Sequence, residues 1–332
     1  MNRKAICITL LLVSLMIAAH VCSINTSAVS AETSGFIPET NQDLLPTVLD
    51  GCRSAVSAIK SGQGKVTAYA SLRSNNGGIL ETETTYQVLF SGDKFKLAVD
   101  EKYLKNSPGE PLPSDRMLLE PGSLISRQVA YDAERTTTFM PQEHEATIGD
   151  RSTNSGQEAI DDGHNAAFVG HYGLLEIAKW VVGPSVYTRG TPKIVGRETL
   201  NGNDCVVVEF LLTGKDIVHT FWFWVDPAKG FTVPRIRSWA EGTGLREKIL
   251  TGEVNTEMRQ YADGNWGPAR ATVAQYRINP LSGEYYRNAQ YVTTFDPNFQ
   301  INVPVTDSEL TLTLPSGTTV TNELLQETYT VP

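Results

Sequence analysis

The chain has 332 residues, with 28 Lys or Arg against 37 Asp or Glu, so its formal net charge is −9. Charged residues make up 20% and hydrophobic residues 40%, which is the composition of a globular protein and excludes a disordered or fibrous chain. The excess of acidic residues also argues against nucleic-acid binding, because a nucleic-acid-binding surface would need a basic stripe.

Residues 1–31 have the pattern of a secretory signal peptide. Arg3 and Lys4 supply a positive start, an apolar run follows over residues 5–21, and small residues lead up to Ala31. We expect cleavage after Ala31 and export to the periplasm (cell envelope) or beyond; an uncleaved membrane anchor is the alternative. No later segment is apolar enough to span a bilayer, so the mature chain is not expected to be an integral membrane protein.

One amphipathic helix is expected to open the mature domain, after a flexible segment of residues 32–42. Asp43 is placed to cap the helix, Pro46 falls in its first turn, and Gly62 is placed to end it. The apolar residues recur at helical spacing and form one stripe: Leu44, Leu45, Val48, Leu49, Cys52, Ala55, Val56 and Ile59.

From Lys65 onward apolar and polar residues alternate, which predicts β-strands. About a dozen strands in meander order predict a mainly β (α+β) fold with one large antiparallel sheet. This domain would span residues 43–314, followed by a C-terminal tail of residues 315–332. The expected strands are 65–73, 84–90, 94–99, 125–131, 135–140, 193–199, 205–212, 218–225, 234–239, 252–261, 269–278, 284–295 and 310–314.

Two segments interrupt the strands. Residues 142–164 are polar and read mostly as loop, whereas residues 168–182 have the apolar spacing of a helix. Leu174, Ile177 and Val181 lie on one stripe of that helix, and further apolar residues lie outside the stripe. Such a helix is buried on most sides, so it either covers an apolar cavity or completes a core.

The segment Phe221–Val225 is apolar on both sides of an expected strand. Phe221 and Phe223 must face one way while Trp222 and Trp224 face the other. Core packing is the commoner cause of such a pattern, and a cavity lining is the alternative.

No catalytic or metal-binding motif stands out. Glu143-His144-Glu145 has metal-ligand residue types, but adjacent residues on an extended chain point to opposite faces, so a solvated loop is the better interpretation. Residues 161–165 indicate a turn rather than a calcium loop. We expect no cofactor, no metal and no enzymatic activity; a hydrolase with a triad assembled from distant residues is a weaker alternative.

Two cysteines, Cys52 and Cys205, remain after removal of the signal peptide. Export makes a disulfide between them possible. Strand parity argues against the bond, because Cys205 shares a strand face with Glu209 and Cys52 belongs to the helix stripe. Two separate buried thiols are the alternative.

Two sequence patterns resemble the LolA/LolB-like superfamily of exported lipoprotein carriers. Residues 194–208 read IVGRETLNGNDCVVV, and residues 223–235 read FWVDPAKGFTVPR. The first helix with its following strand and the segment GDKFKL at residues 92–97 are also similar to that group. The resemblance covers residues 44–295 and implies a strongly curved antiparallel sheet, a half-open barrel, with helices covering an apolar concave face that accepts acyl chains.

The resemblance implies an exported, non-enzymatic binding protein that holds a lipid or an acylated (lipoprotein) ligand in an apolar cavity. The candidate cavity residues are Leu174, Ile177, Val181, Phe221 and Phe223, with the helix expected over the concave face. The alternative is an envelope sensor or protein-interaction module on the same fold. That alternative would use exposed aromatic residues, for which the candidates are Trp239, Tyr285, Tyr286 and Tyr291.

Overall fold

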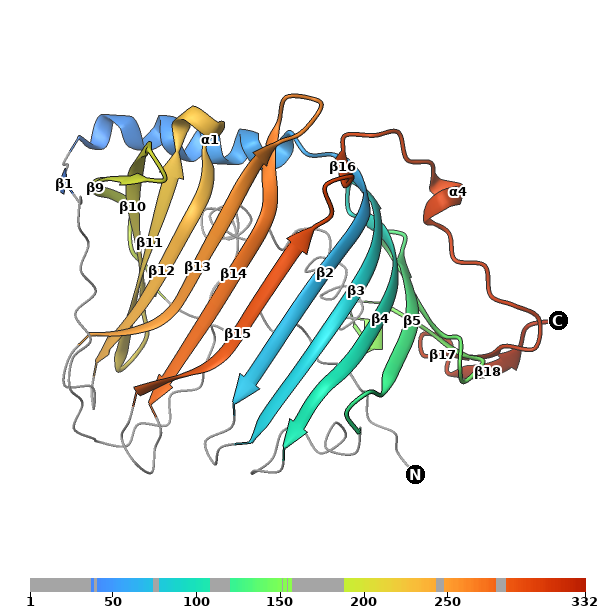
Figure 1. Cartoon of the computed structure of the whole chain (residues 1–332). Helices are drawn as coiled ribbons and strands as arrows, with labels where there is room; N and C mark the ends of the chain where they lie inside the picture. Colours follow the sequence, from blue (N-terminus) through green and yellow to red (C-terminus); the bar gives the residue numbers. More distant parts are fainter. Residues whose placement is uncertain are drawn as a thin grey trace.

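The fold is mainly β, with one large and mostly antiparallel sheet (Figure 1). This computed structural model describes residues 37–38, 41–73, 78–107, 120–150, 152–153, 155–156, 188–242, 248–278 and 285–332. The expected signal peptide at residues 1–31 and the expected helix at 168–182 lie outside these residues. Among the described residues, no helix is both long and apolar enough to cross a bilayer.

The sheet consists of two antiparallel runs that meet side by side. The first run contains β2 (Ser61–Arg73), β3 (Ile79–Ser91), β4 (Lys94–Ser107), β5 (Leu124–Tyr131), β6 (Thr136–Met140) and β7 (Glu145–Gly149). The second contains β9 (Lys193–Leu200), β10 (Asn203–Thr213), β11 (Ile217–Asp226), β12 (Thr232–Gly242), β13 (Ile249–Gln260), β14 (Trp266–Ile278) and β15 (Tyr285–Phe295). Pairing of β15 with β2, which places Tyr291 opposite Ala70, makes the two runs one sheet.

Short strands extend the sheet beyond the two runs. β1 (Ile37–Pro38) pairs with β9, β8 (Thr188–Arg189) with β10, and β16 (Gln300–Ile301) with β2. β17 (Thr319–Asn322) pairs in parallel with β7, and β18 (Glu327–Thr330) pairs with β17. The sheet is therefore wider than the sequence predicted, because two- to four-residue strands are too short to show an alternating pattern.

Three sequence-based expectations about shape are corrected. The sheet is not strongly curled into a half-open barrel, and no pairing among the described residues joins β1 to β18. Residues 315–332, expected to form a tail, contribute β17 and β18. The strand expected at 310–314 is absent: α4 (Asp307–Leu310) ends there, begun by a capping box of Thr306 and Glu309 that sets the helical turn.

The opening helix, α1, spans Leu45–Ser57 and has Pro46 in its first turn as expected. Asp43 does not cap it; instead the Asn41 side chain accepts a hydrogen bond from the Asp43 N–H in a 3-10 turn (Gln42–Leu44) that leads into the helix. Gly62 does not end it either, because the chain has already entered β2. A Cβ at Gly62 would lie 2.5 Å from the Phe90 ring, so close packing of that ring explains the glycine.

The main core lies between α1 and one face of the sheet, here called the α1 face. α1 runs across one end of the strands, from near β9, where Gln42 bonds to the Ile194 backbone, to the start of β2 (Figure 1). Its buried residues Val48 and Cys52 belong to the same apolar cluster as Phe90 on β3. The opposite side of the sheet, here called the outer face, carries a smaller cluster around Trp224.

Candidate ligand-binding face

The α1 face is a largely apolar surface that crosses both runs of strands. Alternate residues of each strand point to it, since side chains along a strand switch faces at every residue. The strand residues in this cluster include Val66 and Ala68 (β2), Tyr86, Val88 and Phe90 (β3), Phe95, Leu97 and Val99 (β4), Val129 and Tyr131 (β5), Ile194 (β9), Val206, Val208 and Phe210 (β10), Phe221, Phe223 and Val225 (β11), Ile236 (β12), Val254 (β13), Ala271 and Val273 (β14), and Ala289, Tyr291 and Phe295 (β15).

The aromatic strand β11 divides its side chains between the two faces as strand parity predicts. Phe221 and Phe223 lie in the α1-face cluster, and the Phe223 ring packs edge-on against Phe210 with ring centroids 5.0 Å apart. Trp222 and Trp224 belong to the outer-face cluster. The segment Phe221–Val225 is thus packed on both sides, which accounts for its lack of polar residues.

Of the five candidate cavity residues, Phe221 and Phe223 are buried on the α1 face. Leu174, Ile177 and Val181 lie outside the described residues. Their position over this face, and the role of all five in ligand binding, remain predictions.

A small hollow interrupts the apolar face where β2 and β3 carry their smallest inward side chains. Ala68 lies opposite Thr84 and Ala70 opposite Thr82, so four short side chains stand together and form its floor. Tyr86 and the β15 residue Tyr291 line the hollow as well. Its volume is about 20 Å³, which is room for one small polar group.

Two buried charges, Glu101 and Arg127, complete the lining of this hollow. Glu101 lies on β4 opposite Thr84, and Arg127 lies on β5 opposite Val99, so both side chains project from the α1 face. Arg127 Nη1 and Glu101 Oε2 are 3.8 Å apart, and each side chain is only 8% exposed. A charge pair with so little water contact must balance itself and bond to its surroundings, because desolvation of each ion costs several kcal/mol.

Sequence reasoning missed this polar centre, although strand parity contained the signal. Glu101 stands at an even spacing from Leu97 and Val99, and Arg127 stands two residues from Val129. Each charge therefore interrupts an inward apolar series. The small residues Ala68 and Ala70 did not predict a hollow, because an alanine in a strand is not by itself evidence of a cavity.

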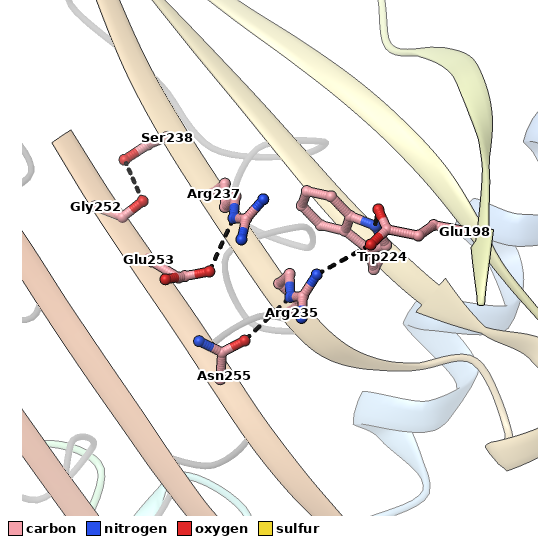
Figure 2. A network of polar contacts seen from close by, with 8 residues as sticks. All are labelled: Glu198, Trp224, Arg235, Arg237, Ser238, Gly252, Glu253 and Asn255. Atoms are coloured by element: carbon pink, nitrogen blue, oxygen red, sulfur yellow. Dashed lines mark hydrogen bonds and ion pairs between the residues drawn. The ribbon is translucent and has the colours of Figure 1, made fainter. Parts of the chain in front are cut away.

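The outer face carries a second polar network, around the two segments that resemble lipoprotein carriers (Figure 2). The indole N–H of the fully buried Trp224 donates to Glu198 Oε2 at 2.8 Å, and Arg235 donates to Glu198 Oε1 at 3.2 Å. The Arg235 guanidinium lies 5.6 Å from the Trp224 ring centroid, within cation–π range. Glu198, Trp224 and Arg235 all come from the quoted patterns, so these patterns encode a contact that ties β9, β11 and β12 together.

A parallel row of contacts continues this network along the outer face. Trp222 donates its indole N–H to Glu209 at 2.9 Å, and Glu209 also pairs with Lys193 at 2.8 Å. On the other side of Trp222, Arg237 bonds to Glu253 at 2.8 Å. The carboxylates of Glu209 and Glu198 therefore satisfy the indole N–H groups of both tryptophans.

The aromatic residues proposed for protein contacts are not equally available. Tyr291 is 5% exposed and belongs to the α1-face cluster, so it is not an exposed contact. Trp239 packs edge-on against Trp222, with centroids 5.1 Å apart. Tyr285 stacks on Tyr276 and bonds to the Leu250 carbonyl, while Tyr286 is partly exposed.

The possible disulfide between Cys52 and Cys205 is not present. Both thiols are free and buried, Cys52 in the α1-face cluster and Cys205 in the outer-face cluster, so the sheet separates them. Burial raises the pKa of each thiol to about 12, and the nearby Asp226 carboxylate adds to this effect at Cys205.

The histidine motif holds no metal-ligand cluster. His144 lies in a turn with φ 53°, and Glu145 begins β7. Within the described ranges, no group of three or more His, Cys, Asp or Glu side chains is placed to hold a metal ion. The turn expected at 161–165 lies outside those ranges.

No protein-family model and no curated protein matches the chain. Among solved structures, it is similar to the crystal structure of LolA superfamily protein NE2245 from Nitrosomonas europaea. The sequence identity is 18%, the match covers 80% of this chain and 97% of that one, and the TM-score is 0.39. At these values no residue role passes from one protein to the other.

Proposed function

We propose that this chain is an exported, non-enzymatic binding protein that holds a lipid or acylated ligand on the α1 face of its sheet. The observation that carries the proposal is the hollow within one broad and largely apolar face. Ala68, Ala70, Thr82 and Thr84 form the floor of that hollow, where larger apolar side chains would have filled the core. A site that is mostly apolar with a few convergent polar groups suits a ligand with a long hydrocarbon part.

Burial of hydrocarbon would supply the affinity. Each buried CH₂ contributes about 0.8 kcal/mol, so two additional carbons strengthen binding by about 1.6 kcal/mol, or roughly 15-fold. The hollow alone holds only a small group. An acyl chain therefore extends from it along the apolar face, and the side chains that cover this face move apart to admit the ligand.

The test begins with lipid extraction from natively purified protein, followed by mass spectrometry. Saturated acyl probes of increasing length then displace a fluorescent fatty acid. A steep gain in affinity with chain length is expected, approaching the 15-fold step for two carbons that full burial gives. Absence of any co-purified lipid, together with no uptake of the fluorescent probe, would refute the proposal.

A pair of variants on β2 distinguishes loss of binding at the hollow from loss of binding through general destabilisation of the protein. Ala70→Phe fills the hollow and should abolish uptake of the probe. Ser71→Phe adds the same ring at the next residue, which points to the outer face, and should leave uptake intact. Equal uptake by both variants would place the ligand elsewhere.

Export is part of the same proposal and rests on the pattern at residues 1–31. N-terminal sequencing of the mature protein should begin at Glu32. A mature protein that retains Met1 in a membrane fraction would favour the uncleaved anchor instead.

A further inference from the structure

We propose that Asn288 accepts a hydrogen bond from a donor group of the acyl ligand, such as a hydroxyl. This inference rests on the proposed function, and it goes further by assigning the position of the ligand's polar end. That position is the end of the α1 face remote from α1. Asn288 is the fourth residue of β15, which begins at that end of the sheet (Figure 1).

A β-bulge turns the Asn288 side chain toward the α1 face. The paired residues on either side of the bulge are Ala289 with Gln275 and Arg287 with Tyr276. Asn288 is therefore an extra residue of β15, and at such a bulge two successive side chains can share a face of the sheet. Ala289 belongs to the α1-face cluster, and Asn288 beside it is only 9% exposed, whereas Arg287 is exposed.

The amide oxygen of Asn288 is buried, and its Oδ1 atom accepts no hydrogen bond from any described residue. Asn322 on β17 is buried to a similar degree, at 8% exposed. Its Oδ1, however, accepts hydrogen bonds from the backbone N–H groups of Leu324 and Leu325. A buried acceptor without a hydrogen bond destabilises a folded protein, so the amide of Asn288 requires an explanation outside the fold.

Neither the backbone nor the packing explains an asparagine at this bulge. Asparagine is enriched where φ is positive, but Asn288 is not one of the described residues with a positive φ. Leucine has a similar size and would bury its side chain here without an unmet hydrogen bond. A hydrogen-bond donor supplied by a ligand explains why the position carries an amide instead.

Asn288 also lies in line with the hollow along the same strand. Tyr291, which lines the hollow, is three residues further along β15, and three residues of a strand span about 10 Å. Between them lies Ala289 with its partner Leu72 on β2, and Leu72 packs against the α1-face cluster. A ligand whose polar end lies at Asn288 therefore has an apolar surface for its hydrocarbon between this end and the hollow.

The test compares two isomeric probes that differ in hydrogen-bond donation: 1-dodecanol, whose hydroxyl donates, and undecyl methyl ether, whose oxygen only accepts. Each probe displaces a fluorescent fatty acid from the wild-type protein, at concentrations below the solubility limit of the probe. The alcohol supplies the hydrogen bond that Asn288 Oδ1 otherwise lacks, so we expect it to bind at least about fivefold more tightly than the ether. This comparison does not depend on the folding of a variant.

Two asparagine-to-leucine variants then assign the preference to Asn288. Asn288→Leu removes an acceptor without a hydrogen bond, so it should raise the urea midpoint of unfolding. It should still bind the fluorescent fatty acid, with a preference for the alcohol below about twofold. The matched control Asn322→Leu removes an acceptor that two backbone N–H groups use, so it should lower the urea midpoint and keep the wild-type preference.

The outcomes distinguish this assignment from the proposed function. A wild-type preference below about fivefold, or a preference above about twofold in Asn288→Leu, overturns the assignment to Asn288 and leaves acyl binding in place. A lowered urea midpoint of Asn288→Leu, or failure of the alcohol to displace a bound fatty acid, has the same meaning. If neither probe and no fatty acid binds, the proposed function is overturned as well.

Discussion

Removal of the Glu198 carboxylate should destabilise the protein by about 3 kcal/mol. Glu198→Ala leaves the indole N–H of the fully buried Trp224 without its acceptor, and an unsatisfied buried donor costs about 1–3 kcal/mol. The same change removes the partner of Arg235. That second cost stays below the 3–5 kcal/mol typical of a broken buried pair, because Arg235 is 24% exposed and keeps its bond to Asn255.

Urea unfolding of Glu198→Ala and of four further variants measures this effect and isolates its parts. Glu198→Gln keeps an acceptor for Trp224 and should cost only about 1 kcal/mol. In a Trp224→Phe background, Glu198→Ala should cost about 1–2 kcal/mol less than in the wild type, because the orphaned N–H is absent there. Asp204→Asn, which removes the more exposed partner of a surface ion pair, is the control and should cost no more than about 0.5 kcal/mol. A Glu198→Ala variant within about 0.5 kcal/mol of wild type would refute the account of this network.

Three further predictions concern single residues. Cys52 and Cys205, whose pKa values burial raises to about 12, should resist iodoacetamide in the folded protein at mildly alkaline pH and both be alkylated in urea; alkylation of fewer than two thiols in urea would contradict the free-thiol assignment. Gly62→Ala should lower the free energy of unfolding by about 1–3 kcal/mol, because the new Cβ would lie 2.5 Å from the Phe90 ring. Adding Phe90→Leu to this variant should recover part of the loss, which the midpoints of urea unfolding measure. Burial lowers the pKa of His219, so as the pH falls the unfolded chain takes up a proton on this residue before the folded protein does. The free energy of unfolding should therefore fall as the pH drops below about 6.5. His219→Gln should flatten that part of the stability–pH curve, and an unchanged slope would contradict a lowered pKa of His219.

The sequence could predict which side chains of the long strands share a face of the sheet, because alternation along a strand depends only on neighbouring residues. The alternation that set Phe221 and Phe223 against Trp222 and Trp224 depends only on a period of two, and burial on both sides does not disturb it. The stripe of α1 was predictable for the same reason, with a period of 3.6.

Features that depend on partners distant in the sequence were not predictable. Glycine commonly ends a helix, but Gly62 is explained instead by its close packing against the Phe90 ring on the neighbouring strand. The parallel pairing of β17 with β7 follows from nothing in either four- or five-residue segment alone. The hollow likewise needs the register of β2 against β3, which brings Ala68 and Ala70 beside Thr84 and Thr82.

The junction of β2 and β15 bears on the order in which the molecule folds. Within each run, neighbouring strands are joined by local connections, and hairpins of this kind form in microseconds. The partners across the junction are about 220 residues apart in the chain, so their pairing carries a much larger loop-closure entropy. The hollow straddles this junction, since Ala70 and Tyr291 belong to its two sides. The two antiparallel runs can therefore fold early, whereas the proposed ligand site forms only when β2 pairs with β15. A ligand bound across this junction would slow the separation of the two strands.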